Sequence, residues 1–414
     1  MNRRDFLKLS SLVVGGFFSN GFTFLDKTPN LINDDLSKVT RVRYKDITLP
    51  LLTLGCMRFP LKSSDSSDID TLHVQKMVDY AIAHGLNYFD TAYPYHSGKS
   101  EIVIGNALKK HPRNSFYIST KLPTWMINSE ADVHRIFDEQ LKKTQLKHFD
   151  FYFIHTLNKN TYENNCKKNK VYELLKKKKS EGKIKYLGFS FHDNPDVLEV
   201  IAREYPWDFG MIQLNYLDWD VIDSERMYEI MLKNNIPTWV MEPVRGGQLA
   251  SLNERATTIF KNANPNVSTA SWAIRYAASL PNVTTVLSGM SNIDQLQDNI
   301  KTMTNFKPLS DQERNVISTA LIAYRSSGTI PCTNCKYCVP YCPLKIDIPN
   351  NFNIYNQFLI DNNSRLFVRN YNALHDFEKS SKCVKCKLCM PHCPQKIEIP
   401  NFLSKITEKY NEVS

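Results

Sequence analysis

The sequence has almost no cysteine outside two short C-terminal segments. Of its ten cysteines, only Cys56 and Cys166 lie elsewhere in the 414 residues. A disulfide framework would need cysteines spread along the chain, so this distribution argues against a fold held together by disulfides. We expect Cys56 to fill an apolar core and Cys166, which lies in a polar stretch, to be exposed.

Positive charge is not concentrated in a patch that would indicate a nucleic-acid partner. The formal net charge is +10, but the densest basic run, residues 176–179, has no interleaved aromatic residues. Lysines are favoured in the last turn of a helix, where they interact with the helix dipole. We therefore predict a solvated helix end at this run and no binding of nucleic acid.

The N-terminal apolar run is too short for an ordinary membrane span. It covers residues 9–18 and follows a basic motif made by Arg3, Arg4, Phe6, Leu7 and Lys8. This arrangement resembles a twin-arginine export signal, so we expect residues 1–30 to be a leader and the protein to be exported; without a functional leader it would be cytoplasmic. No clear A-x-A site follows, which leaves open both a cleaved leader and a retained membrane tether.

Short β-prone segments alternate with helix-like segments from about residue 40. The expected strands are residues 52–59, 87–92, 116–121, 151–156, 186–191, 211–216, 238–243 and 285–290. Helix-like stretches follow them, for example at residues 72–84, 133–146 and 268–279. Eight such units predict an α/β fold, a (β/α)8 TIM barrel over residues 40–325, rather than an open sheet. The active site of that fold lies at the C-terminal ends of its strands.

The C-terminal region contains one cysteine spacing twice. Both copies read C-x2-C-x2-C-x3-C-P and continue as Lys-Ile, an acidic residue, Ile-Pro-Asn. The first copy contains Cys332, Cys335, Cys338 and Cys342, and the second contains Cys383, Cys386, Cys389 and Cys393. This spacing wraps thiolates around a cubane, whereas zinc sites favour C-x2-C pairs separated by a loop. We therefore predict two [4Fe–4S] clusters.

The segment between the two copies has the apolar spacing of helices. Residues 350–381 place Phe352, Tyr355, Phe358 and Leu359 on one expected helix face,. The region resembles a helical two-cluster ferredoxin, so we expect residues 326–414 to form a small, mostly helical ferredoxin-like domain. In two-cluster ferredoxins the fourth cysteine of each run ligates the other cluster. By this resemblance Cys393 completes the first cluster and Cys342 the second.

Four chemically active residues lie at or just after the ends of successive expected strands. Asp90 ends the second strand, Tyr95 follows it, and Lys121 and His155 end the third and fourth strands. These positions resemble those of the aldo-keto reductases, which reduce carbonyl groups with a nicotinamide cofactor. The resemblance implies that Tyr95 is the general acid or base and that Lys121 lowers its pKa. It also implies that Asp90 orients Lys121 and that His155 polarises the substrate oxygen.

The same resemblance implies contacts with NAD(P)H along the strand ends. Ser190 and Gln213 match positions that bind the nicotinamide carboxamide, and the loop with Val244, Arg245 and Gly246 matches a pyrophosphate site. The matches to an adenosine-binding element are Gly289, Ser291, Gln295 and Asn299. That element lacks the basic residues that hold a 2′-phosphate, so NADP is not favoured over NAD.

These motifs are compatible with three functions. In the leading hypothesis, the barrel exchanges a hydride between NAD(P)H and a small carbonyl or alcohol, while the clusters carry single electrons to or from a redox partner protein. In the alternative, the protein is an exported iron–sulfur electron carrier whose barrel is a non-catalytic docking scaffold. A third hypothesis gives the clusters a structural role only. The four residues at successive strand ends favour the first.

Overall fold

The larger part of the molecule is a closed barrel of eight parallel strands. The computed structural model describes residues 31–414 apart from 64–65, 327 and 362. The barrel strands are β4 (Leu52–Gly55), β5 (Tyr88–Asp90), β6 (Tyr117–Pro123), β7 (Phe149–Leu157), β8 (Ile184–Phe191), β9 (Phe209–Gln213), β10 (Thr238–Met241) and β11 (Val283–Ser288). The predicted TIM barrel is confirmed. Strand β4 ends earlier than expected, because Cys56–Arg58 turns into a 3-10 helix.

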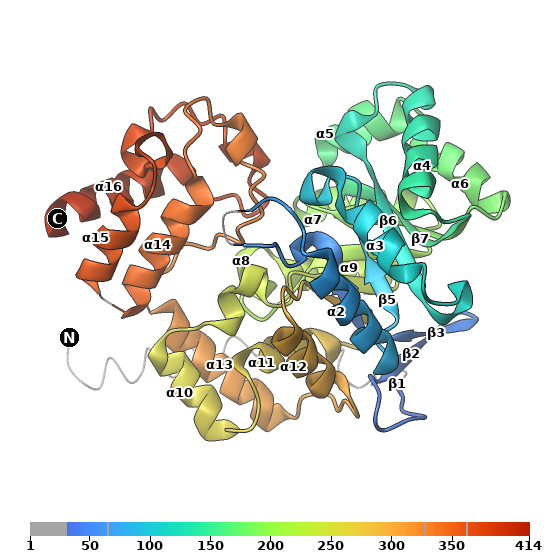
Figure 1. The fold of residues 1–414 in the computed structure, drawn as a ribbon, viewed down its shortest axis with the longest axis horizontal. Coiled ribbons are helices and arrows are strands. Elements are labelled where there is room, and N and C mark those ends of the chain that lie inside the picture. The colour runs from blue at the N-terminus through green and yellow to red at the C-terminus, as the bar shows by residue number, and fades with distance from the viewer. Residues whose placement is uncertain (1–30, 64–65, 327, 362) are drawn as a thin grey trace.

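Helices pack around the barrel, and two of them, at residues 254–263 and 311–325, pack against each other on the side towards the C-terminal region (Figure 1). The helices are α2 (Thr71–Ala83), α3 (Ser100–Leu108), α4 (Glu130–Thr144), α5 (Lys159–Thr161), α6 (Val171–Ser180), α7 (Pro195–Glu204), α8 (Asp218–Val221), α9 (Ser224–Lys233), α10 (Glu254–Ala263), α11 (Thr269–Ala278), α12 (Ile293–Met303) and α13 (Asp311–Arg325). The expected helices at 72–84, 133–146 and 268–279 correspond to α2, α4 and α11. Helix α4 begins with a capping box between Ser129 and Asp132,. The lysine run at 176–179 lies at the end of α6, as predicted.

A small antiparallel sheet closes one end of the barrel. It consists of β1 (Leu31–Ile32), β2 (Arg41–Tyr44) and β3 (Ile47–Pro50). Tyr44 is 3% exposed and packs edge-on against Trp239, with 5.1 Å between ring centroids. Trp239 lies near the start of β10, so this aromatic contact plugs the N-terminal end of the barrel. The opposite end, where the strands stop, stays available for a site.

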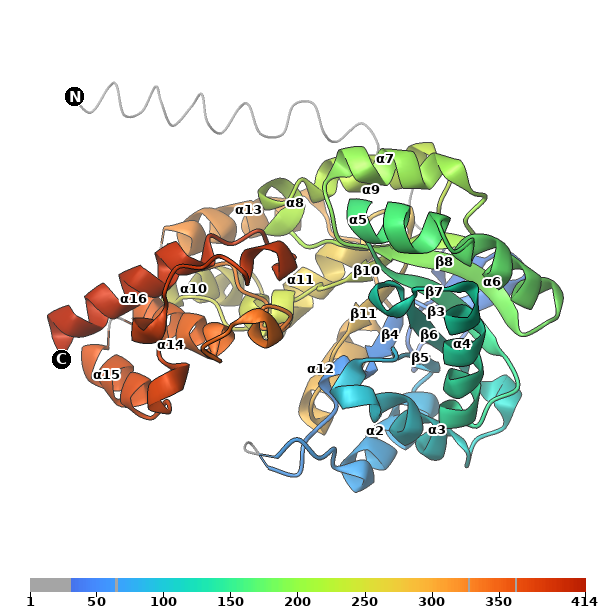
Figure 2. The same cartoon turned by 90° about the horizontal axis from the view of Figure 1, so that it is seen from above.

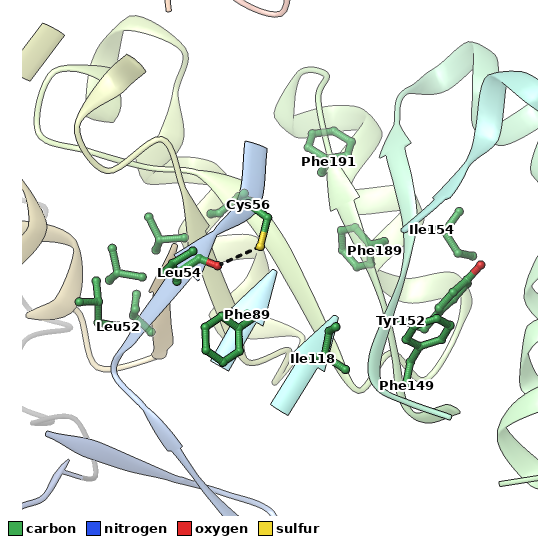
Figure 3. Close-up of a cluster of buried hydrophobic side chains, with 14 of the residues drawn as sticks. Leu52, Leu54, Cys56, Phe89, Ile118, Phe149, Tyr152, Ile154, Phe189 and Phe191 are labelled. Atoms are coloured by element: carbon green, nitrogen blue, oxygen red, sulfur yellow. Dashed lines mark hydrogen bonds between the residues drawn. The ribbon is translucent and has the colours of Figure 1, made fainter. Parts of the chain in front are cut away.

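The main core fills the space between the strands and the helices (Figure 3). Cys56 is fully buried there, with its Sγ 3.8 Å from the Leu54 carbonyl oxygen, which confirms its prediction as a core residue. The expectation that Cys166 is exposed was wrong, because only 5% of this residue is accessible. Cys166 lies four residues after buried Tyr162 in a helical turn, so both side chains share its inward face,.

The C-terminal region is helical and lies beside the barrel (Figures 1 and 2). Its helices are α14 (Ile348–Asp361), α15 (Ser364–Asn372) and α16 (Ile399–Val413), which confirms the predicted helical connection. Phe352, Phe367 and Leu403 belong to a separate apolar core. The same core buries the isoleucines of both Ile-x-Ile segments, namely Ile346, Ile348, Ile397 and Ile399.

The leader predicted at residues 1–30 lies outside the described residues. Within the ranges that the structure describes, no helix combines the length and the apolar character that a bilayer crossing requires.

Candidate active site

Asp90 and Lys121 form a buried contact near the strand ends, and partly buried Tyr95 lies beside it. Asp90 ends β5 and Lys121 lies on neighbouring β6, so parallel pairing brings both to the same end of the barrel. The Lys121 Nζ donates to Asp90 Oδ2 at 2.6 Å and to the Thr91 carbonyl oxygen at 2.8 Å, and it lies 3.4 Å from the Tyr95 hydroxyl. Ser119 donates to Asp90 Oδ1 at 2.6 Å. The carboxylate therefore fixes the ammonium group beside the phenol.

His155 lies on β7, next to this contact. Its ring meets the Tyr95 ring edge-on, with 6.1 Å between centroids. Only 2% of His155 is exposed, and its Nδ1 has no hydrogen-bond partner among the described residues. Buried polar atoms normally have partners, so this nitrogen is a candidate contact for a bound molecule. The structure thus brings all four predicted catalytic residues together.

Burial decides the protonation of these groups. It raises the pKa of Tyr95 well above its usual value, and the Asp90 carboxylate adds to the rise. The sequence led us to expect a pKa lowered by Lys121, but loss of solvent around the phenol dominates, and among the nearby cations it is Arg58 that lowers the pKa in part,. Burial, followed by the charge of Lys121, lowers the pKa of His155 well below its usual range. Near neutral pH, Tyr95 therefore holds its proton and His155 is uncharged.

The four residues open into a cavity of about 280 Å³ that has two different walls. The first, the strand-end wall, consists of Asp90, Tyr95, Lys121, His155 and His192 from the barrel. The second, the cluster wall, consists of Thr333, Cys335, Tyr337, Pro394 and Gln395 from the cysteine-rich region. The cavity therefore lies between the barrel mouth and the cysteine loops.

A pair of side-chain amides joins the barrel to the cluster wall. The Gln213 Nε2 donates to Gln395 Oε1 at 3.0 Å, and the Gln395 Nε2 donates back to Gln213 Oε1 at 2.9 Å. The second Nε2 hydrogen of Gln213 goes to Asp218 Oδ2 at 2.7 Å. Gln395 Oε1 also accepts from Arg245 Nη2 at 3.1 Å. The amide predicted to bind a nicotinamide carboxamide thus already binds the same chemical group from the chain itself.

Close backbone packing also joins the barrel to the cluster wall. Gly246 has φ +64°, and a Cβ built there would lie 2.2 Å from the Thr333 carbonyl oxygen. The same oxygen accepts a hydrogen bond from Arg58 Nη2 at 2.9 Å. Only glycine allows this approach, because any other residue would meet the Thr333 backbone and would also be strained at this φ.

The predicted nucleotide contacts have two different placements. Most of them line the cavity: Ser190, Gln213, Val244, Gly246, Gly289, Ser291, Gln295 and Asn299. Arg245 does not line it, because its guanidinium is buried against Asp218, with Nε 2.9 Å from Oδ1. The Ser190 Oγ accepts a hydrogen bond from the Thr156 backbone N–H at 2.8 Å. The residues that line the cavity extend from Tyr95 and its neighbours to Gln295 and Asn299 on α12.

The eight motif cysteines gather around two small cavities. Cys332, Cys335, Cys338 and Cys393 line the first, with Phe352 and Ile397 among its apolar neighbours. The second is lined by Cys342, Cys383, Cys386 and Cys389. No three His, Cys, Asp or Glu side chains within the described ranges converge tightly enough to hold one metal ion. Four thiols around a cavity, rather than around a point, fit a cubane, whose irons sit at separate corners.

Sequence reasoning missed two residues of the walls. His192 directly follows β8 and is partly buried, and loss of solvent around its ring and the charge of Lys121 lower its pKa to about 4. Its place after Phe191 at a strand end is the signal that also marked His155. Gln395 gave no comparable signal, because its role depends on packing against a residue 182 positions away.

Two family models match separate parts of the chain. The model of the aldo/keto reductase family matches residues 51–322, and that of the 4Fe-4S dicluster domain matches residues 331–398. The first match covers well over half of the sequence.

Curated proteins and solved structures show the same likeness over the barrel. An uncharacterized oxidoreductase of Bacillus subtilis, YqkF, is 24% identical over 292 residues, which cover 65% of this chain and 91% of that protein. A thermostable aldo-keto reductase in complex with epalrestat superposes with a TM-score of 0.56 at 22% identity, covering 67% of this chain and 99% of that one. An aldo-keto reductase of Klebsiella pneumoniae in complex with NADPH gives 0.56 at 19%, with coverages of 70% and 95%. The structural likenesses concern the fold.

Proposed function

The chain belongs to the aldo/keto reductase family and carries a 4Fe-4S dicluster domain, and from this premise we propose that it exchanges a hydride between a nicotinamide cofactor and a carbonyl or alcohol substrate. One observation carries the proposal: the Tyr95 hydroxyl lies 3.4 Å from Lys121 Nζ, which Asp90 fixes at 2.6 Å. The contact faces the cavity that the proposed cofactor and substrate would share.

Proton transfer in this proposal belongs to Tyr95. A bound nicotinamide would supply a hydride to the carbonyl carbon or accept one from the alcohol carbon. In reduction, the Tyr95 O–H bond breaks, a new O–H bond forms on the substrate oxygen, and the phenolate remains beside Lys121. The fixed ammonium stabilises that negative charge without reorganising, which is how preorganised sites lower a barrier. Uncharged His155 donates a hydrogen bond that orients the substrate oxygen.

The cysteine cavities have a separate role in the proposal. Each would hold one [4Fe–4S] cluster, which accepts or releases single electrons when bound. Cys335 lines both the first cysteine cavity and the active-site cavity. In this proposal a one-electron carrier would therefore lie next to a two-electron site.

The test uses the cluster-loaded protein under anaerobic conditions. NADH or NADPH is mixed with a panel of aldehydes and ketones, and nicotinamide oxidation and alcohol formation are followed together. We expect carbonyl-dependent oxidation with equal amounts of alcohol. Clusters that are reduced by dithionite in a protein without hydride transfer in either direction would support the second candidate, an electron carrier with a non-catalytic barrel. The occupied amide of Gln213 is the observation that favours this candidate.

A further inference from the structure

The two cysteine motifs are related by an approximate two-fold axis. Tyr341 and His392 occupy the same position, directly before the fourth cysteine of each motif. Their rings stack on each other, with 3.3 Å between centroids and 2° between planes. Equivalent residues that meet face to face lie at a two-fold axis. Each surface of one motif therefore has a counterpart on the other.

Residues 333–337 of the first motif and their counterparts 384–388 of the second differ in what covers them. Thr333, Cys335 and Tyr337 belong to the cluster wall and face the barrel cavity. At the same positions of the second motif, Val384 is 66% exposed and Leu388 is 55% exposed, and Cys386 between them is exposed as well. The more apolar copy is thus the one that nothing covers within the described chain.

We call the segment 384–388, together with Leu344 and Lys345, the outer face. Leu344 and Val384 line the second cysteine cavity and are both exposed, so the face directly covers that cavity. Contiguous exposed apolar side chains around one functional group are typical of interaction sites rather than of ordinary solvated surface.

The outer face is also basic. It contains Lys345, Lys385 and Lys387, all exposed. Within the described part of the chain no carboxylate lies at ion-pairing distance from any of the three, whereas nearby Lys382 pairs with Asp376 at 2.6 Å. An apolar centre with an uncompensated cationic rim is complementary to a partner whose contact surface is acidic.

We propose that the outer face docks an acidic single-electron carrier protein. This inference rests on the proposed electron-carrying role of the clusters and names the kind of partner. Each docking event transfers one electron, so the donor is oxidised by one electron as the cluster is reduced, or the reverse. Two such events balance one hydride at the barrel. A protein carrier fits better than a lipid surface, because the exposed ligand Cys386 lies at the centre of the face.

Two variants remove different properties of the face. Lys385→Glu/Lys387→Glu reverses its charge, and Val384→Ser/Leu388→Ser removes its apolar centre. The matched control is Lys176→Glu/Lys177→Glu, which makes the same charge change at two exposed lysines on α6. A variant is used only if its iron content equals that of the unmodified protein. If a double variant loses iron, the single substitutions Lys385→Gln and Lys387→Gln are measured in its place.

Cluster reduction is followed anaerobically by stopped-flow loss of visible absorbance, without substrate or nicotinamide. The two reductants are reduced methyl viologen, a small cation that needs no docking, and a reduced acidic plant-type [2Fe–2S] ferredoxin. We expect the charge-reversed variant to be reduced by the ferredoxin at least about tenfold more slowly at low salt, because steering by complementary charge is worth at least that factor. The serine variant should also be slower, at any salt concentration. Reduction by viologen should not change, and the control should match the unmodified protein with both reductants.

Equal ferredoxin rates in all variants would overturn the proposal. It would also be overturned if the same lysines controlled co-sedimentation with phosphatidylserine vesicles while the ferredoxin rates stayed constant, since the face would then bind membranes. Clusters that viologen itself cannot reduce would refute the electron-carrying role, and the docking proposal with it. A failure of docking alone is distinguishable, because it leaves the viologen rate intact.

Discussion

The two walls of the active-site cavity are built in different ways. The strand-end wall is held by contacts between neighbouring strands, such as Lys121 with Asp90, 31 residues apart. The cluster wall is held by contacts between remote segments, such as Arg58 with Thr333, 275 residues apart. The barrel alone therefore fixes the reacting groups, whereas the cysteine-rich region determines the space that surrounds them.

The strongest test of this division is Tyr95→Phe in the strand-end wall. We expect carbonyl reduction to fall by about 10²- to 10⁴-fold, the usual contribution of a positioned proton donor. Nicotinamide affinity, measured by fluorescence titration, should change little because the ring remains. Tyr93→Phe is the matched control, since the Tyr93 hydroxyl binds Glu139 instead. If the Tyr95→Phe protein kept full activity, Tyr95 would not be the proton donor.

The cluster wall can be tested through the fourth cysteines. Cys342→Ala should lose about half of the bound iron, namely the second cluster, and leave the cluster wall intact. Cys393→Ala should lose the other half and alter nicotinamide affinity, because Pro394 and Gln395 follow it directly. Iron is counted after anaerobic purification, and Cys335→Ala or Cys386→Ala is then added to each variant. If Cys386→Ala rather than Cys335→Ala removed the remaining cluster from the Cys342→Ala protein, each motif would close its own cluster.

His192, the partly buried histidine of the strand-end wall, predicts a pH effect on stability. His192 has a pKa of about 4 when folded, and its ordinary value is 6.5. The unfolded chain therefore takes up a proton that the folded chain does not as pH falls from 6.5 towards 4, and the resulting loss of unfolding free energy approaches about 3 kcal/mol. Denaturant unfolding of the unmodified protein and of His192→Asn is compared at pH 7.5 and 5. Identical losses in the two proteins would show that His192 titrates normally.

Gly246→Ala tests the backbone contact between Gly246 of the barrel and Thr333 of the cluster wall. The added Cβ meets the Thr333 carbonyl oxygen at 2.2 Å in a left-handed backbone, so we expect a loss of about 2 kcal/mol in unfolding free energy,. Gly182→Ala has φ +72° but nothing within 4 Å, and should lose only about 1 kcal/mol for the backbone strain,. Thermal unfolding and limited proteolysis near residue 328 distinguish the two variants. Equal losses would mean that the walls are not held by this contact.

The smallest effect concerns the amide pair. Gln395→Ala frees the Gln213 amide, so nicotinamide should bind about fivefold more tightly, which corresponds to about one hydrogen bond. Gln248→Ala is a matched control, because Gln248 also contacts Arg245, at 3.1 Å, but does not touch Gln213. Binding is measured by fluorescence titration without substrate. Unchanged or weaker binding in Gln395→Ala would show that the two amides do not compete.

The strand-end wall was largely predictable from the sequence, because it follows from counting. Eight β-prone segments imply a barrel, and parallel strands bring their last residues to one rim, so Asp90, Lys121 and His155 had to meet. The resemblance to two-cluster ferredoxins similarly grouped Cys393 with the first three cysteines of the first motif, and these four line one cavity of the structure. The sheet β1–β3 was missed because its strands, of two to four residues, are too short to show alternation. The cluster wall was missed because no local pattern encodes contacts between residues 182 or 275 positions apart.

The crossing of cysteines between the two cavities has a consequence for how the protein is made. The first cavity, beside the barrel, needs Cys393, so neither cavity is complete before almost the whole chain has left the ribosome. Domains generally fold during synthesis from the N-terminal end, so the barrel forms while its mouth is still open. Insertion of the proposed clusters would then be the last step of maturation, and assembly of the cysteine-rich region around them would close the active site.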